Sequence, residues 1–166
     1  MIMIFGVVLA GGIGSRMGNV DKPKQYLLVG EKPIIIHTLE RFYVQNEFEK
    51  IIVLCPEEWV SHTKNLIKKY MKDTERIVVL RGGDTRNETI MNSLRYIEKE
   101  YGLDDDTIVV THDSVRPFVT QRIIEENIKY AKEYGACDTA VAATDTIVYS
   151  QDNVLISDIP DRSKMY

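Results

Sequence analysis

The chain has 166 residues, which suits a single domain with a sizeable core, and its hydrophobic (44%) and charged (28%) fractions are ordinary for a soluble globular protein. The net charge of -4 argues against a nucleic-acid partner, and no apolar run reaches the length needed to span a membrane. Because there is no basic leader and Cys55 and Cys137 lack the spacing of a metal site, we expect a reduced, cytoplasmic protein.

The first predicted element is an apolar strand that ends at Leu9 and opens into a glycine-rich loop. The glycines of this loop are Gly11, Gly12, Gly14 and Gly18. Glycine lets the backbone approach a ligand closely, and successive N–H groups in such a loop can converge on an anion. Arg16 and Lys24 add positive charge, so we predict a phosphate or nucleotide site. The alternative is a plain tight turn.

Two common nucleotide-binding loops do not fit this stretch. A P-loop ends in Gly-Lys-Ser/Thr, which is missing here. A dinucleotide fingerprint needs the spacing G-x-G-x-x-G at the start of a helix and an acid at the end of the second strand. Here the glycine spacing differs, Pro23 disfavours an uninterrupted helix, and the second strand ends at Cys55 and Pro56. We therefore do not expect nicotinamide chemistry.

Strands and helices alternate along the rest of the chain. Apolar runs rich in β-branched residues predict strands at 51–54, 77–80, 107–111 and 139–143. Apolar residues at helical spacing predict helices over 33–45 and 57–72, over a stretch that includes 90–97, and over a stretch that includes 123–131. Thr120 is placed to cap the last helix and Gly135 to end it. This alternation is typical of an α/β fold with a mainly parallel sheet.

The end of the chain has a different pattern. Two short apolar runs, 146–149 and 154–156, flank the polar residues 150–153, which predicts a β-hairpin. We therefore expect a main domain over residues 1–143 and a hairpin arm over 144–166.

Three loops are expected at the carboxyl ends of the strands, where parallel sheets bind their ligands: 10–24, 82–86 and 112–117. Their charged side chains are Arg16, Lys24, Asp84, Arg86, Asp113 and Arg116. This set suits nucleotidyl transfer, in which catalysis is mainly positioning and charge stabilisation. Asp113 is the predicted magnesium ligand, because Mg²⁺ often takes one carboxylate besides phosphate oxygens. The alternative is that Asp113 only caps a turn, and its neighbour His112 either orients it or packs against backbone.

Several segments together resemble the cytidylyltransferases that couple CTP to a sugar-alcohol phosphate. In chain order they are LAGGIGSRMG, DKPKQYL, GGDTRNET, HDSVRPF, DTIV and PDRSKMY. The resemblance implies a Rossmann-like three-layer α/β/α nucleotidyltransferase fold with a projecting β-hairpin arm. It also implies a homodimer formed through residues 144–166, with CTP and a polyol phosphate as substrates.

The resemblance also implies roles for individual residues. Arg16 and Lys24 match the pair that stabilises the transition state, and Asp113 matches the ligand of Mg²⁺ or another divalent cation. The matching nucleotide-binding residues are Leu9, Ala10, Gly11, Gly12, Gly14, Gly83, Asp84, Thr85, Arg86, Thr89 and Ser114. The matching acceptor-phosphate residues are Arg116, Asp145, Thr146 and Arg162, the last of which would act in the partner's site.

The acceptor is narrowed to two candidates by the same motifs. The Ala-Gly-Gly form of the first loop, HDSVRP and PDRSKMY look more like the ribitol-5-phosphate type, which serves teichoic-acid and capsule precursors. The sequence therefore predicts CMP transfer to D-ribitol 5-phosphate, giving CDP-ribitol and pyrophosphate. One alternative is the 2-C-methyl-D-erythritol 4-phosphate enzyme of isoprenoid synthesis. Because family members continue for several dozen residues past the last motif, the other is a nucleotide-binding fragment that is catalytically incomplete.

Overall fold

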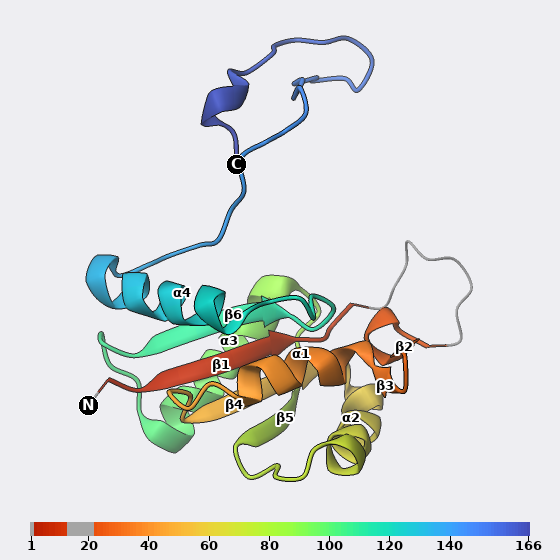
Figure 1. Ribbon diagram of the computed structural model, residues 1–166, viewed down its shortest axis with the longest axis vertical. Helices are drawn as coiled ribbons and strands as arrows, with labels where there is room; N and C mark the ends of the chain where they lie inside the picture. The colour runs from red at the N-terminus through yellow and green to blue at the C-terminus, as the bar shows by residue number, and fades with distance from the viewer. Residues whose placement is uncertain (1, 13–21) are drawn as a thin grey trace. The chain divides into compact units, whose positions relative to one another are not determined.

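A four-stranded parallel sheet forms the centre of the computed structural model, which describes residues 2–12 and 22–166 (Figure 1). Its order is β5-β4-β1-β6, and each neighbouring pair is parallel. The strands are β1 (Ile4–Leu9), β4 (Lys50–Cys55), β5 (Ile77–Arg81) and β6 (Ile108–Asp113). All four strands therefore end at one edge of the sheet, and the predicted α/β fold with a mainly parallel sheet is confirmed.

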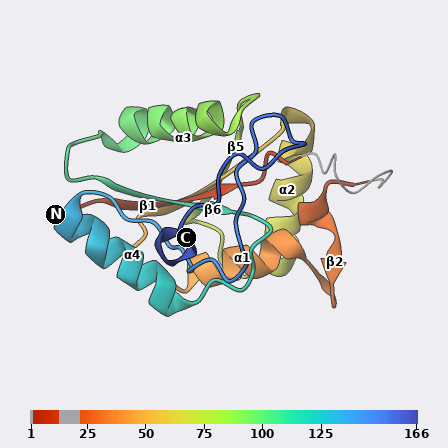
Figure 2. The ribbon, with the colours of Figure 1, turned by 90° about the horizontal axis from the view of Figure 1, so that it is seen from above.

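Helices cover both faces of this sheet. They are α1 (Ile34–Tyr43), α2 (Glu57–Tyr70), α3 (Arg86–Tyr101) and α4 (Gln121–Tyr134). Figure 2 shows α3 on one side of the sheet and α1 and α4 on the other. No helix in the described part of the chain combines the length and apolar composition that a membrane span requires.

The alternation of side chains along β1 produces two core clusters. Val8 packs with buried residues of α1, α2 and α4, such as Leu39 and Ile128, whereas Phe5 packs with Ile97 of α3. Both faces of β1 are thus buried, which is why this strand has no polar residue between Ile4 and Leu9. Burial on both faces fixes the position from which the following loop departs.

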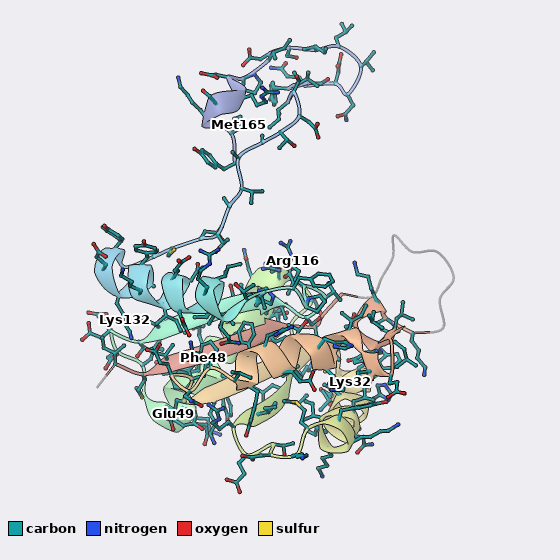
Figure 3. The ribbon with its side chains drawn as sticks, viewed as in Figure 1. Lys32, Phe48, Glu49, Arg116, Lys132 and Met165 are labelled. Carbon is teal, nitrogen blue, oxygen red and sulfur yellow. The ribbon has the colours of Figure 1, made fainter. Side chains whose placement is uncertain are left out.

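Shorter elements connect β1 to α1. A 3₁₀ turn, η2 (Lys24–Tyr26), precedes a two-stranded antiparallel ribbon of β2 (Leu28–Val29) and β3 (Lys32–Pro33). Figure 3 labels Lys32 on this ribbon, where its ammonium group pairs with Glu40 of α1 at 2.6 Å.

The predicted boundaries of α4 are confirmed by its caps. The Thr120 hydroxyl accepts a hydrogen bond from the backbone N of Ile123 (3.3 Å), and Gly135 ends the helix with a φ of 83°, in the left-handed region.

The chain forms two compact units, Met1–Ala136 and Cys137–Tyr166. The predicted strand at 139–143 is wrong, because these residues of the second unit have no strand pairing. The backbone N of Thr139 donates to its neighbour Asp138 (2.8 Å), and that of Ala143 donates to Met165 O (2.9 Å), so neither bond belongs to a ladder. Apolar composition favours extended backbone, but a strand also needs a neighbour that supplies hydrogen bonds.

The predicted hairpin is reduced to one antiparallel bridge, between Tyr149 and Asp158. The residues between them turn around Asp152, whose Oδ1 accepts hydrogen bonds from the backbone N of Val154 and of Leu155, both at 2.9 Å. These bonds use the N–H groups that a second strand at 154–156 would have needed, so the prediction of a regular hairpin is wrong.

Candidate functional site

The candidate site starts where β1 ends, between the loops that follow β4 and β6. Ala10 N donates to Leu54 O (2.8 Å), and Ser114 N donates to Leu9 O (3.0 Å). Gly11 comes next, and a Cβ built on it or on Gly12 would meet no atom within 4 Å. The predicted nucleotide-binding residue Gly14 and the predicted catalytic residue Arg16 lie outside the described residues.

Lys24 is the first residue of η2. It is exposed, whereas Pro23 before it and Gln25 after it are buried. The side chain of Gln25 donates from Nε2 to Ala10 O at 2.7 Å, so the turn that carries Lys24 is joined to the end of β1. Gln25 was not among the predicted site residues.

The second glycine loop lies between β5 and α3. Thr85 is the N-cap of α3, and its hydroxyl accepts from Glu88 N (3.1 Å), while Glu88 Oε2 accepts from Asp84 N (2.8 Å). A Cβ on Gly83 would lie 2.6 Å from the Cβ of Glu88, so only glycine fits there without a shift. Glu88 was also missed by the prediction, although the spacing Thr-x-x-Glu is a known signal for such a cap.

The predicted nucleotide-binding residue Thr89 stabilises this loop by hydrogen bonds to its backbone. Its hydroxyl donates to Thr85 O (2.8 Å) and accepts from Gly83 N (3.0 Å), and its side chain is buried. The loop therefore has a defined shape before any ligand binds.

Asp113 at the end of β6 is shared by two arginines. Arg86 Nη1 lies 2.6 Å from Asp113 Oδ1, and Arg116 Nε lies 2.9 Å from Oδ2. Burial alone would raise the pKa of Asp113, but the hydrogen bond and charge of Arg86, helped by Arg116 and His112, hold it below its ordinary value. The structure thus joins predicted residues of two loops around an ionised carboxylate. Both arginines are exposed, with 59% of the Arg86 side chain and 72% of the Arg116 side chain accessible. Figure 3 labels Arg116, and it labels Glu49 and Lys132 toward the amino end of the sheet.

The turn after β6 is held by a hydrogen bond from α1 and by a hydrogen bond between two of its own residues. Thr38 of α1 donates to Ser114 O at 2.8 Å, and this bond is buried. His112 Nε2 donates to Arg116 O at 3.0 Å, and its ring lies 5.3 Å from that of Phe42. His112 therefore packs against backbone and holds the turn of which Asp113 is part.

The remaining predicted residues belong to the second unit. They are Asp145, Thr146 and Arg162, and within that unit Arg162 Nη1 donates to Thr144 O at 3.1 Å.

The donor set suits a divalent cation that is held mainly by its substrate. No group of three metal-ligating side chains is found among residues 2–12 and 22–166, which argues against a closed site made by these residues alone. Asp113 offers one carboxylate with a side chain 26% exposed, and Mg²⁺ commonly binds through one or two carboxylates besides phosphate oxygens and water.

Comparisons with known proteins identify the family of this chain. The family model IspD, described as 2-C-methyl-D-erythritol 4-phosphate cytidylyltransferase, matches residues 4–166. The chain is similar to 4-diphosphocytidyl-2C-methyl-D-erythritol synthase from Anaerococcus prevotii DSM 20548, with 26% identity and a TM-score of 0.78 over 99% of this chain and 66% of that one. It is also similar to 2-C-methyl-D-erythritol 4-phosphate cytidylyltransferase from Francisella tularensis, with 28% identity and a TM-score of 0.69 over 96% of this chain and 66% of that one.

A more distant likeness concerns the fold alone. The bifunctional IspDF of Campylobacter jejuni is 23% identical, with a TM-score of 0.74 over 98% of this chain and 38% of that one. The chain thus spans 66% of the length of the Anaerococcus and Francisella proteins.

Proposed function

Because the chain belongs to the 2-C-methyl-D-erythritol 4-phosphate cytidylyltransferase family, we propose that it transfers CMP from CTP to the phosphate of a short polyol. The observation that carries the proposal is the meeting of two loops at the carboxyl edge of the sheet, where Arg86 and Arg116 share Asp113. Cationic groups around a carboxylate suit a triphosphate and its divalent cation.

In the proposed reaction an oxygen of the acceptor phosphate attacks the α-phosphorus of CTP. A new P–O bond forms, the bond from the α-phosphorus to the bridging oxygen breaks, and pyrophosphate leaves with that electron pair. Lys24 and Arg16 stabilise the growing negative charge on the α-phosphate and on pyrophosphate. Asp113 would hold Mg²⁺ or a similar cation, which supplies further positive charge when bound.

We propose 2-C-methyl-D-erythritol 4-phosphate as the acceptor, because the family match and the Anaerococcus and Francisella relatives favour it. D-ribitol 5-phosphate stays a second candidate on the motifs HDSVRP and PDRSKMY. In either case the proposed acceptor-phosphate residues are Arg116, Asp145, Thr146 and Arg162. Measuring kcat/KM for both acceptors in one assay distinguishes them. The natural acceptor is expected to have the higher kcat/KM, because it makes hydroxyl or methyl contacts that the other acceptor lacks.

The test of the reaction itself is pyrophosphate release by wild type and Lys24→Ala. Removal of a group that stabilises transition-state charge is expected to lower turnover by about 10²–10³. Lys99→Ala, at an exposed position of α3, is the matched control and keeps wild-type turnover. A wild-type protein that binds CTP with Mg²⁺ but releases no pyrophosphate with either acceptor would instead be a nucleotide-binding module.

We further propose that residues 144–166 form a dimerisation arm. Large apolar side chains of this segment are exposed, including Val154 (82%), Leu155 (69%) and Ile156 (61%). An isolated ribbon is marginal in water, so these side chains need a surface to cover them, which a second copy supplies under twofold symmetry. Arg162 then acts on the acceptor phosphate in the partner's site.

A further inference from the structure

The turn that carries Lys24 is anchored on its inner side by a buried glutamine. Gln25 is 2% exposed, and its Nε2 donates to Ala10 O at 2.7 Å. Ala10 is itself fixed, because its N donates to Leu54 O of β4 at 2.8 Å. One amide therefore connects η2 to the central strands of the sheet.

The same turn is anchored on its other side by Tyr26. The phenol OH of Tyr26 lies 2.7 Å from Thr63 Oγ1 of α2, and its ring stacks on that of Trp59 at 4.9 Å. Since Thr63 donates its own proton to Trp59 O (2.8 Å), Tyr26 is the donor in the bond to Thr63. The residue next to Gln25 is thus held by a second element.

These anchors leave Lys24 as the exposed residue of η2 beside two buried ones. The anchors of Gln25 and Tyr26 fix the turn that carries Lys24, and this limits the region that its ammonium group can reach. A charged group placed by its neighbours in this way meets the developing charge without reorganisation. Misplacement of such a group by about 1 Å can lower a rate about 10²-fold.

We propose that Gln25 is a positioning residue, which acts on nucleotidyl transfer by fixing Lys24 against the end of β1. The proposal rests on the proposed function, in which Lys24 contacts the phosphates of CTP. Gln25 itself touches no substrate, because its amide is turned inward to Ala10 O.

The test uses a pair of glutamine substitutions. Gln25→Met keeps the length of the side chain and removes its donor. Gln45→Met is the control, because Gln45 is also buried (7% exposed) and its Nε2 has no hydrogen-bond partner in the described part of the chain. We expect Gln25→Met to lower kcat about 10- to 100-fold with a smaller change in KM, and Gln45→Met to leave both unchanged.

A double-mutant cycle with Lys24→Ala separates positioning from general loosening of the fold. If Gln25 acts through Lys24, Gln25→Met has no further effect in the Lys24→Ala background. The idea is overturned if Gln25→Met is fully active, if it lowers kcat equally with and without Lys24, or if Gln45→Met is impaired to the same degree. Should Gln25→Met fail to fold, Tyr26→Phe loosens the same turn from its other side and enters the same cycle.

A second readout keeps failure of the positioning role apart from failure of the proposed reaction. Calorimetric titration with CTP and Mg²⁺ measures affinity without turnover, so the same cycle is followed on Kd if wild type binds CTP but is inactive. Non-additive losses of affinity for Lys24→Ala and Gln25→Met support the proposal, and additive losses contradict it. If the wild-type protein does not bind CTP, this result contradicts the proposed function itself. The proposed coupling between Gln25 and Lys24 is then contradicted as well, because it rests on that function.

Discussion

Asp113 is the negatively charged residue at the centre of the candidate site, and its one carboxylate pairs with the guanidinium groups of Arg86 and Arg116. The residue was predicted from sequence because an aspartate after an apolar strand reaches the binding edge of a parallel sheet. Gln25 and Thr38 were not predicted from the sequence. Gln25 bonds to the carbonyl group of Ala10 and Thr38 to that of Ser114, and a local sequence pattern does not indicate a bond to a residue so far along the chain.

We expect Asp113→Asn to remove the Mg²⁺ dependence of CTP binding and to lower pyrophosphate release by about 10² or more. An amide keeps the shape of the side chain but not its negative charge. Calorimetry with CTP, with and without Mg²⁺, measures the first effect. Asp106→Asn, at the exposed amino end of the same strand region, is the control, and equal losses in both variants would contradict the role of Asp113.

Tyr26 makes the stability of the fold fall as the pH becomes alkaline. Burial raises the pKa of Tyr26 far above its ordinary value, and this effect outweighs the hydrogen bond to Thr63, which lowers the pKa. The neutral phenol is therefore favoured in the folded state, and its contribution is complete below pH about 10 and lost as pH rises toward the raised value. We expect Tyr26→Phe to flatten the fall in unfolding free energy between about pH 10 and 11.5.

Urea unfolding at a series of pH values checks this expectation. Tyr166→Phe, at an exposed position (78%), should keep the wild-type slope. A Tyr26→Phe protein with the same alkaline slope as wild type would exclude Tyr26 as the group responsible.

At the scale of elements, Arg76, which comes just before β5, holds the end of α1 and the loop that leads from α1 to β4. Its guanidinium donates to the carbonyl oxygens of Tyr43, Gln45 (3.1 Å) and Phe48 (3.4 Å) and lies 4.5 Å from the ring centre of Tyr43. Figure 3 labels Phe48, whose buried ring stacks on that of Phe42. Arg76 thus satisfies the carbonyl group of Tyr43, which the end of α1 leaves without a helical partner, and carbonyl groups of the loop that follows.

We expect Arg76→Ala to lower the free energy of unfolding by about 2 kcal/mol, because charged hydrogen bonds are lost and carbonyl groups are left unpaired. Arg76→Lys should recover only part of this, since one ammonium group cannot reproduce the planar fork. Denaturant unfolding measures both variants. The exposed Arg95→Ala, on α3, is the control with a change within about 0.5 kcal/mol, and an Arg76→Ala protein within that range would contradict the clamp.

Sequence patterns predicted the parallel strands and the helices around them because the same residues that prefer each conformation also form the core. Ile51–Leu54 prefers extended backbone and is buried between two neighbours, so preference and packing agree. The prediction failed at 139–143, where the composition is similar but no ladder forms. It also failed at 154–156, where the Asp152 carboxylate binds the backbone N–H groups.

For the whole molecule, the resemblance seen in the motifs is confirmed at the level of the family, which matches residues 4–166. The subtype was harder to predict. Ribitol and methylerythritol phosphates share the phosphate that basic residues recognise, and differ only in their hydroxyl and methyl groups.

The proposed arm predicts a homodimer in solution. Size-exclusion chromatography with light scattering should give twice the chain mass, and Leu155→Asp combined with Ile156→Asp should give a monomer, because charge opposes burial of this apolar surface. Mixed dimers of Arg162→Ala and Lys24→Ala subunits should regain activity, since one site then has both native residues. A wild-type monomer at micromolar concentration contradicts the dimer, and mixed dimers without rescue contradict the role of Arg162 in the partner's site.

The central place of β1 has a consequence for the order in which the protein folds. Phe5 pairs with Lys50 on one side and, more than twice as far along the chain, with Val109 on the other. Each doubling of a closed loop costs only about 0.6 kcal/mol, but distant contacts form late and slow folding. We expect pulse-labelled amides of β1 and β4 to be protected before those of β6. On the ribosome, the carboxylate of Asp113 would then meet Arg86 only after most of the chain has emerged, so the nascent protein cannot assemble the proposed nucleotide site early.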